Sequence, residues 1–264
     1  MNPERPEETE IEIRECATIE EFDECVRLQR EAFGLPDIEL SPRRHLIVSR
    51  KAGGWTLAAF DRGRMVGFVH QMAAVRDRDL LTGYSHMMAV ARDYQNRGVG
   101  ARLKWAQRAR ALEEGRTLIN WTWDPMQARN AHFNLNRLGA VVRSYAVNFY
   151  GTDYITLGQA DLEGRGLGID SDRLFADWDL NSKRVAELAS GQSPTLMEEA
   201  RAAIEIPPDW SGLLRIDAAA ARREQLRVRA EFEQAFAAGL VCAAFARDAE
   251  HPRYLLFHES STRE

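Results

Sequence analysis

The chain has 264 residues, 45% of them hydrophobic and 28% charged, a balance typical of globular proteins. Its formal net charge of −5 argues against general binding to nucleic acid or anionic membranes, which requires a basic surface. Three cysteines without C-x-x-C spacing favour a reduced, cytoplasmic location, and neither a signal peptide nor a membrane-length apolar run is found.

The first part of the chain predicts two helices and then three strands. Residues 1–10 are acidic and contain proline, which predicts a disordered tail. A short strand near residue 11 is followed by a capping box, Thr18 with Glu21, and by a helix that ends at Gly34. The next elements are a helix over residues 42–51 and strands over 55–60, 65–75 and 80–91. The tight turns between these strands predict an antiparallel meander.

A glycine-rich turn, YQNRGVGARL from Tyr94 to Leu103, joins the third of these strands to a helix predicted over residues 99–114. Such a turn presents unpaired N–H groups at the positive end of the helix dipole, which makes a site for a phosphate or diphosphate. Gly98 and Gly100 allow a close approach of the anion, because no Cβ stands in the way. The turn is neither a dinucleotide-binding G-x-G-x-x-G motif nor a P-loop, since no Gly-Lys-Ser/Thr follows.

The second part of the chain continues with alternating strands and helices. A strand over residues 117–123 precedes Asp124 and Pro125, which predict the start of a helix that ends at Gly139. The remaining elements are strands over 140–150 and 172–180, a glycine-rich loop over 151–170, helices over 183–189 and 217–238, and strands over 240–246 and 254–258.

The pattern Gln95-x-x-Gly98-x-Gly100 resembles the acyl-CoA diphosphate loop of the GCN5-related N-acetyltransferase (GNAT) superfamily, and the order of the predicted elements matches as well. The resemblance covers residues 11–181 and implies an α/β (α+β) architecture, the acyl-CoA N-acyltransferase fold. This fold has a mixed, mostly antiparallel central sheet, splayed between strands 4 and 5 and flanked by helices. Residues 182–264 would form a C-terminal αβ extension that could serve as a structural brace, an acceptor-site wall or a dimer contact.

The same resemblance implies a binding site for acetyl-CoA or another acyl-CoA. The loop residues that would hold the diphosphate are Gln95, Asn96, Arg97, Gly98, Val99, Gly100 and Ala101. Backbone groups of Met88, Ala89 and Val90 would bind the pantetheine arm, and the side chain of Asn130 or Asn134 would form hydrogen bonds with the pantetheine amides. Most of the basic residues near the loop are expected on a solvated helix face, with one or two near a CoA phosphate: Arg97, Arg102, Lys104, Arg108 and Arg110. The histidines lack metal-ligand spacing, so no metal is expected.

The candidate catalytic residues lie on the third strand of the meander. Strand alternation predicts that Tyr84, His86 and Met88 share one face. Several superfamily members carry a catalytic Glu or His at the positions that match Tyr84 and His86. The ordinary pKa of histidine suits a general base, although His86 could instead be hydrogen-bonded inside the sheet. Tyr84 could relay a proton or pack as an aromatic side chain.

The general acid is left open. Many superfamily members place a tyrosine where this chain has Leu135, so the acid would be Tyr145, Tyr150 or solvent. Trp121 and Trp123 are expected in the core, with an aromatic acceptor wall as the alternative. Asp124 is expected to cap a helix rather than to bind an amine.

We therefore expect an acyl-CoA-dependent N-acyltransferase that transfers an acetyl group by default, directly in a ternary complex, to a small-molecule amine or amino acid. The alternative is a non-catalytic acyl-CoA-binding module. Neither nucleic acid nor membrane is an expected partner, and a homodimer is left open. The loop over residues 151–170 could lie over the acceptor site.

Overall fold

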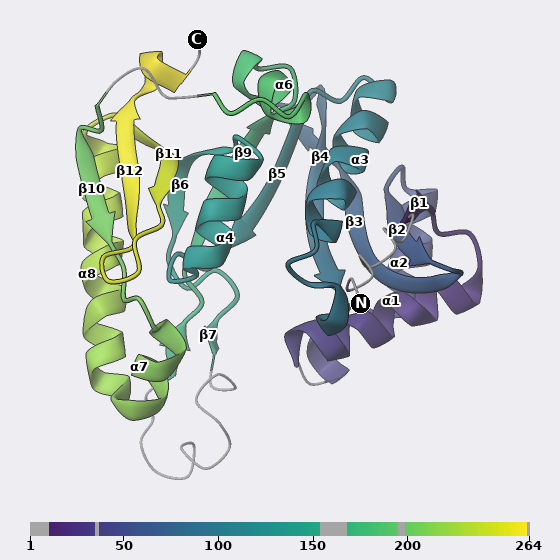
Figure 1. Cartoon of the computed structure of the whole chain (residues 1–264), viewed down its shortest axis with the longest axis horizontal. Helices are drawn as coiled ribbons and strands as arrows, with labels where there is room; N and C mark the ends of the chain where they lie inside the picture. Colours follow the sequence, from purple (N-terminus) through teal and green to yellow (C-terminus); the bar gives the residue numbers. More distant parts are fainter. Residues whose placement is uncertain (1–10, 35–36, 154–167, 195–198, 263–264) are drawn as a thin grey trace, which may run out of the picture. The chain divides into compact units, whose positions relative to one another are not determined.

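The computed structural model describes residues 11–34, 37–153, 168–194 and 199–262 (Figure 1). Contacts divide the chain into two compact units, Met1–Ile119 and Asn120–Glu264. The predicted tail over residues 1–10 and most of the predicted loop over 151–170 lie outside the described residues. The division of the chain at residue 181 and the splay between the fourth and fifth strands stay predictions.

The first unit contains an antiparallel meander in the strand order β1-β2-β3-β4. The strands are β1 (Glu12–Glu15), β2 (Trp55–Asp61), β3 (Arg64–Arg76) and β4 (Leu80–Val90). The helices are α1 (Ile19–Phe33), α2 (Arg43–Lys51) and α3 (Val99–Glu113), with short 3₁₀ turns η1 (Asp37–Glu39) and η2 (Arg92–Tyr94). This order confirms the sequence prediction for the first part of the chain.

The predicted capping box of α1 is present. The Glu21 N–H donates to Thr18 Oγ1 over 3.3 Å, and the Thr18 N–H donates to Glu21 Oε2 over 3.2 Å. The helix ends at Gly34, whose φ of 64° lies in the left-handed region that glycine adopts without strain. α1 therefore begins and ends where local hydrogen bonding and backbone preference predict.

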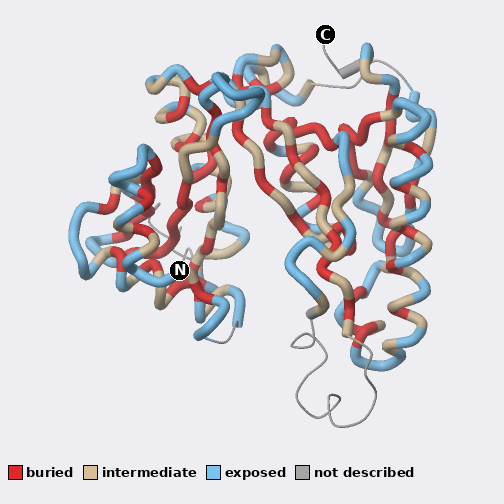
Figure 2. The backbone as a smooth tube through the Cα atoms, turned by 180° about the vertical axis from the view of Figure 1, so that it is seen from behind, coloured by how far each residue is buried: buried red, intermediate tan, exposed pale blue. Residues whose placement is uncertain are grey.

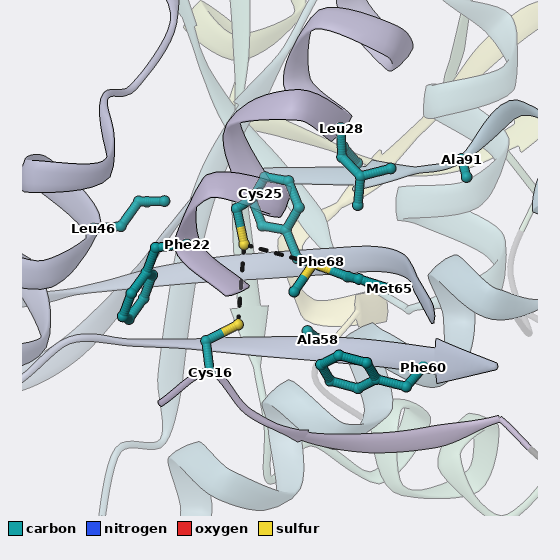
Figure 3. Packing of buried hydrophobic residues seen from close by; sticks show 11 residues of the cluster. Cys16, Phe22, Cys25, Leu28, Leu46, Ala58, Phe60, Met65, Phe68 and Ala91 are labelled. Atoms are coloured by element: carbon teal, nitrogen blue, oxygen red, sulfur yellow. Dashed lines mark hydrogen bonds between the residues drawn. The ribbon is translucent and has the colours of Figure 1, made fainter. Parts of the chain in front are cut away.

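α1 and α2 cover one face of the meander with a core of apolar side chains (Figure 3). β2 is buried along its whole length, and Figure 2 shows the burial along the backbone. Cys16 and Cys25 are free thiols in this core with their Sγ atoms 4.0 Å apart. The contact with Cys16 and burial raise the pKa of Cys25, so this thiol stays protonated and unreactive. α3 packs on the opposite face, where its Leu103 lies against Gly67.

The second unit contains strands in the order β5-β9-β6-β11-β12-β10. They are β5 (Leu118–Trp123), which begins at the end of the first unit, β6 (Val141–Ala146), β9 (Arg173–Asp179), β10 (Ala202–Glu205), β11 (Leu240–Ala246) and β12 (Arg253–His258). The strands β7 (Thr152–Asp153) and β8 (Ile169–Asp170) form a separate pair. β9 lies between β5 and β6 and corresponds to the strand predicted over residues 172–180.

The helices of this unit are α4 (Ala128–His132), the π-helix η3 (Phe133–Arg137), α6 (Lys183–Ala189), α7 (Trp210–Ile216) and α8 (Ala218–Ala237), and the 3₁₀ turn η5 (Glu259–Thr262) follows β12. The helix predicted before Gly139 is thus short and continues as a π-helix, and the strand predicted over 140–150 ends at Ala146. α7 and β10 were not predicted. β11 pairs with β6 through Cys242 and Val142, so the C-terminal segment extends the sheet.

Gly139 follows η3 and offers a test of the packing in this unit. An alanine here is expected to lower the free energy of unfolding by about 2–3 kcal/mol. Its φ of 77° strains any side chain, and a Cβ would lie 2.9 Å from Leu188 Cδ1 and 3.2 Å from Val185 Cγ2. Gly239 is the matched control, because its φ is 76° but nothing lies within 4 Å of an added Cβ. Urea denaturation of both alanine variants should show the larger loss for Gly139→Ala, and equal losses would contradict the packing.

Candidate active site

The predicted anion-binding turn begins α3. Gly98 is the N-cap residue of α3, with φ of 81°, and no side chain caps this helix end. Asn96 also has a positive φ, 62°, whereas Arg97 between them does not. Asparagine and glycine are the residues that adopt this backbone region most readily, so the sequence QNRGVG fits the shape of the turn. Successive N–H groups in such an alternating backbone point toward a common centre.

The amide groups of the turn are available to a ligand. Among the described residues, none accepts a hydrogen bond from the backbone N–H groups of residues 96–101. Nothing lies within 4 Å of a Cβ built on Gly98, so the space beside the N-cap is open. Unpaired amides at the positive end of a 15-residue helix form an anion site.

The segment before the turn is held by contacts with three other elements. The Arg92 N–H donates to Glu31 Oε1 of α1 over 2.8 Å, and the Tyr94 hydroxyl donates to Asp61 Oδ2 of β2. That hydrogen bond raises the pKa of Tyr94. Gln95 Nε2 donates to the Val90 carbonyl of β4 over 3.1 Å. These contacts fix the path of the chain into the turn, so the amide groups are preorganised.

The basic residues near the turn differ in their environments. The Arg97 guanidinium lies 5.5 Å from the centre of the Tyr94 ring. Arg102 donates to the Ile11 carbonyl, and Arg110 pairs with Glu114 over 3.3 Å. Lys104 is only 3% exposed, so its predicted place on the solvated helix face is wrong. Its Nζ contacts Ser85 Oγ at 3.0 Å and Gln107 Oε1 at 2.8 Å, and burial lowers its pKa well below the usual range.

A β-bulge in β4 changes the predicted orientation of the candidate catalytic residues. Ser85 pairs with Gln71 of β3, but Met87 pairs with His70, which leaves His86 as the extra residue. Ser85 contacts Lys104 of α3, whereas His86 and Met87 point to the α1/α2 face. Beyond the bulge, Met88 returns to the α3 face, where its Cε lies 3.4 Å from a Cβ built on Gly100.

The prediction that Tyr84, His86 and Met88 share one face is therefore wrong for Met88. Tyr84 pairs with Met72 and lies one residue before Ser85, so its side chain points to the same face as His86. The backbones of Met88, Ala89 and Val90 pair with β3 residues Val69, Phe68 and Gly67.

His86 belongs to a cluster of three imidazole rings on the α1/α2 face. The ring centres lie 5.5 Å from His86 to His45 of α2, 6.2 Å from His86 to His70 of β3, and 5.6 Å from His45 to His70. His70 is fully buried and its Nδ1 lies 2.8 Å from Thr56 Oγ1. The buried Nε2 atoms of His45 and His70 have no partner among the described residues.

Burial favours the neutral imidazole form of two members of this cluster, His70 and His86. Burial, and then its neighbours His86 and His45, lower the pKa of His70 to about 3. Burial and His45 also lower the pKa of His86 below its ordinary 6.5. Because its pKa is lowered, His86 is an uncharged imidazole at neutral pH and can accept a proton. The ring is only half-buried, so an acceptor can reach it. Within the described parts of the chain, no group of three or more His, Cys, Asp or Glu is arranged to hold a metal ion.

The other predicted residues lie in the second unit. Asn130 is exposed on α4, and Asn134 is buried in the π-helix η3. Leu135, at the position of the superfamily's tyrosine, is fully buried. The sequence prediction missed Asn136, whose Oδ1 accepts from the Phe245 N–H over 2.9 Å and ties η3 to β11.

The alternatives for acid and acceptor residues can be separated by their contacts. The Tyr145 hydroxyl donates to Asp172 Oδ2 over 2.7 Å, and burial raises its pKa far above the usual range. Tyr150 is 60% exposed. Trp121 and Trp123 are buried, which confirms their expected place in the core. Asp124 accepts from the Met126 N–H over 2.9 Å in a turn, but α4 begins only at Ala128 with Gln127 as its N-cap residue, so the prediction that Asp124 caps this helix is wrong.

The sequence comparison identifies the class of domain that carries this site. Residues 14–139 match the model of the Acetyltransferase (GNAT) family. The chain therefore contains a GNAT-family acetyltransferase domain, as its sequence resemblance predicted. Among curated proteins, none matches the chain at a significant level.

Solved structures with similar backbones include several acetyltransferases. The ribosomal-protein-S18-alanine N-acetyltransferase of Escherichia coli has 16% identity and a TM-score of 0.49, over 64% of this chain and 94% of its own. A GNAT acetyltransferase of Streptococcus pneumoniae has 21% identity and a TM-score of 0.47, over 64% and 98%. A GNAT acetyltransferase of Elizabethkingia anophelis with acetyl-CoA bound has 15% identity and a TM-score of 0.45, over 64% and 97%.

No helix in the described part of the chain is long and apolar enough to cross a membrane.

Proposed function

We propose that the protein is an acyl-CoA-dependent N-acyltransferase that acetylates a small-molecule amine or amino acid. The observation that carries this proposal is the turn at residues 96–101, with its alternating backbone and its amide groups without acceptors in the described chain. A diphosphate bound there would be held by six N–H groups at a helix N-terminus, and no metal would be needed. Acetyl-CoA, the co-substrate of the family, carries such a diphosphate.

The acyl group would pass directly from the thioester to the amine in a ternary complex. The amine nitrogen attacks the thioester carbonyl, the C–N bond forms as the C–S bond breaks, and His86 takes the proton from the attacking nitrogen. Backbone groups of Met88, Ala89 and Val90 are the proposed partners of the pantetheine arm, with Asn130 or Asn134 as further contacts.

The leaving CoA thiolate can be protonated by solvent in this scheme. Leu135 has no proton to give, and the Tyr145 proton is engaged by Asp172. A thiolate is a good leaving group because the ordinary pKa of a thiol lies near 8.5, so a dedicated acid is not required. The expected cytoplasmic location and the identity of the acceptor stay predictions.

The proposal is tested by measuring CoA binding and thiol release with the same protein. Isothermal titration should show CoA binding, and a panel of amines and amino acids with acetyl-CoA should reveal an acceptor through free thiol. Binding without thiol release across the panel would instead identify a non-catalytic acyl-CoA-binding module. Absence of CoA binding at millimolar concentration would contradict both.

The contribution of the turn can be isolated with two matched glycines. Gly98→Ala should weaken CoA binding by about 5- to 30-fold, because an alanine relaxes out of the left-handed conformation in the free protein and must return to it, at about 1–2 kcal/mol, to bind the diphosphate. Gly63, in the turn between β2 and β3, is the control: its φ is 80° against 81° for Gly98, and neither has an atom within 4 Å of an added Cβ. Gly63→Ala should lose similar stability but keep its CoA affinity. Equal affinities in the two variants would place the diphosphate elsewhere.

A further inference from the structure

Ser41 contacts the candidate base directly. It lies between η1 and α2, and its Oγ is 3.0 Å from Nε2 of His86. This distance is a good hydrogen bond between a hydroxyl and an imidazole nitrogen. Among the described residues, it is the only hydrogen bond made by the His86 ring.

The position of Ser41 is itself fixed by a buried amide side chain. Gln29 of α1 is 1% exposed and binds the Ser41 backbone at two points. The Ser41 N–H donates to Gln29 Oε1 over 2.8 Å, and Gln29 Nε2 donates to the Ser41 carbonyl over 3.1 Å. A two-point contact with a rigid helix leaves Ser41 little freedom, so its hydroxyl is held at a defined place beside the ring.

A neutral imidazole has one N–H and one free lone pair, and only the nitrogen with the lone pair can act as a base. Nδ1 of His86 has no partner among the described residues, whereas Nε2 faces Ser41. We propose that Ser41, held by Gln29, is a positioning residue that accepts the Nε2–H of His86 and leaves Nδ1 to take the proton from the acceptor amine. This inference rests on the proposed function of His86 as the base.

The arrangement predicts how His86 responds when Ser41 is changed. When Nδ1 gains a proton, the bond from Nε2–H to Ser41 Oγ becomes charge-assisted and stronger. The hydroxyl therefore favours the charged form of His86, in opposition to burial and to His45 from α2. His70 from β3 is the other titratable group that faces the ring, and its own pKa of about 3 keeps it uncharged. Loss of the hydroxyl should lower the pKa of His86 further and reduce its strength as a base.

The experiment compares Ser41→Ala with Ser41→Thr, which keeps the hydroxyl. NMR titration of His86, assigned with a His86→Gln spectrum, should give a pKa lower by about one pH unit in Ser41→Ala. The same variant should lose about tenfold in kcat, with an unchanged KM for acetyl-CoA. Ser41→Thr should restore both quantities, and Gln29→Met should shift both in the direction of Ser41→Ala. Ser49→Ala, a buried serine of α2 outside the histidine cluster, is the matched control and should change neither.

The outcomes separate this inference from the proposed function. An unchanged or raised His86 pKa in Ser41→Ala overturns the inference, because the hydroxyl would then not accept from Nε2. The inference is also overturned if Ser41→Ala lowers kcat and Ser41→Thr has the same low kcat. Turnover that survives His86→Ala contradicts the proposed base instead, and the titration still tests the contact, since it needs no turnover.

Discussion

Replacement of His86 by alanine is expected to lower kcat by a factor of about 10²–10⁴ and to leave the Kd for CoA unchanged. His86 lies on the α1/α2 face of β4, where the bulge directs its side chain. The anion-binding turn is a separate backbone feature at the start of α3 and has no contact with the imidazole among the described hydrogen bonds. Loss of the imidazole should therefore remove proton acceptance without disturbing cofactor binding.

The pH dependence of the wild-type enzyme should report the same group. Burial and His45 lower the pKa of His86 below 6.5, and only the neutral imidazole can act as the base. Activity should thus be retained at pH 6.5 and fall as the pH drops through the lowered pKa. His86→Ala should lose this acid limb of the kcat profile together with most of the rate.

An exposed histidine from the second unit is a suitable control. His258→Ala removes an imidazole from the end of β12 and should keep both the rate and the acid limb. The measurement is steady-state thiol release between pH 5 and 8 with the acceptor found in the panel. A His86→Ala enzyme with wild-type kcat would show that another group, or solvent, takes the proton.

Local sequence patterns predicted the anion-binding turn because its chemistry is local. Gly98 and Asn96 are residue types that adopt positive φ angles readily, and the first amide groups of any helix lack a partner within that helix. The capping box of α1 was predictable for the same reason. The failures arose where packing decides: the π-helix η3 and the bulge at His86 leave no clear trace in hydrophobic periodicity.

The histidine cluster shows what sequence counting could still have found. In the β3–β4 hairpin, Arg76 pairs with Leu80 and Gln71 with Ser85, so counting outward from the turn places His86 opposite His70. Such a cross-strand pair shares one face, which would have brought the two rings together. His45 and Ser41 could not be found this way, because the docking of α2 on the sheet is a tertiary contact.

The same cluster predicts a steep acid sensitivity of the folded state. The pKa of His70 is lowered to about 3 from 6.5, so between these values the unfolded chain binds a proton that the folded chain does not. The stabilising contribution is fully present above pH 6.5 and is lost as the pH falls toward 3. The slope from this residue is about 1.4 kcal/mol per pH unit, or on the order of 3 kcal/mol between pH 6.5 and pH 4.

His70→Gln isolates this contribution from the rest of the molecule. The variant should be less stable at pH 7, because the contact of His70 with Thr56 is altered, but its free energy of unfolding should fall less steeply below pH 6.5. Carboxylates with lowered pKa values, such as Glu31, begin to contribute only below their ordinary 4.5, so the range from pH 6.5 to 5 reports mainly histidines. His251→Gln is the control: the contact with Glu205 raises the pKa of this exposed imidazole, so its removal should not flatten the slope. Equal slopes for wild type and His70→Gln in urea denaturation would mean that His70 can be protonated without cost, and so that the cluster is open to water.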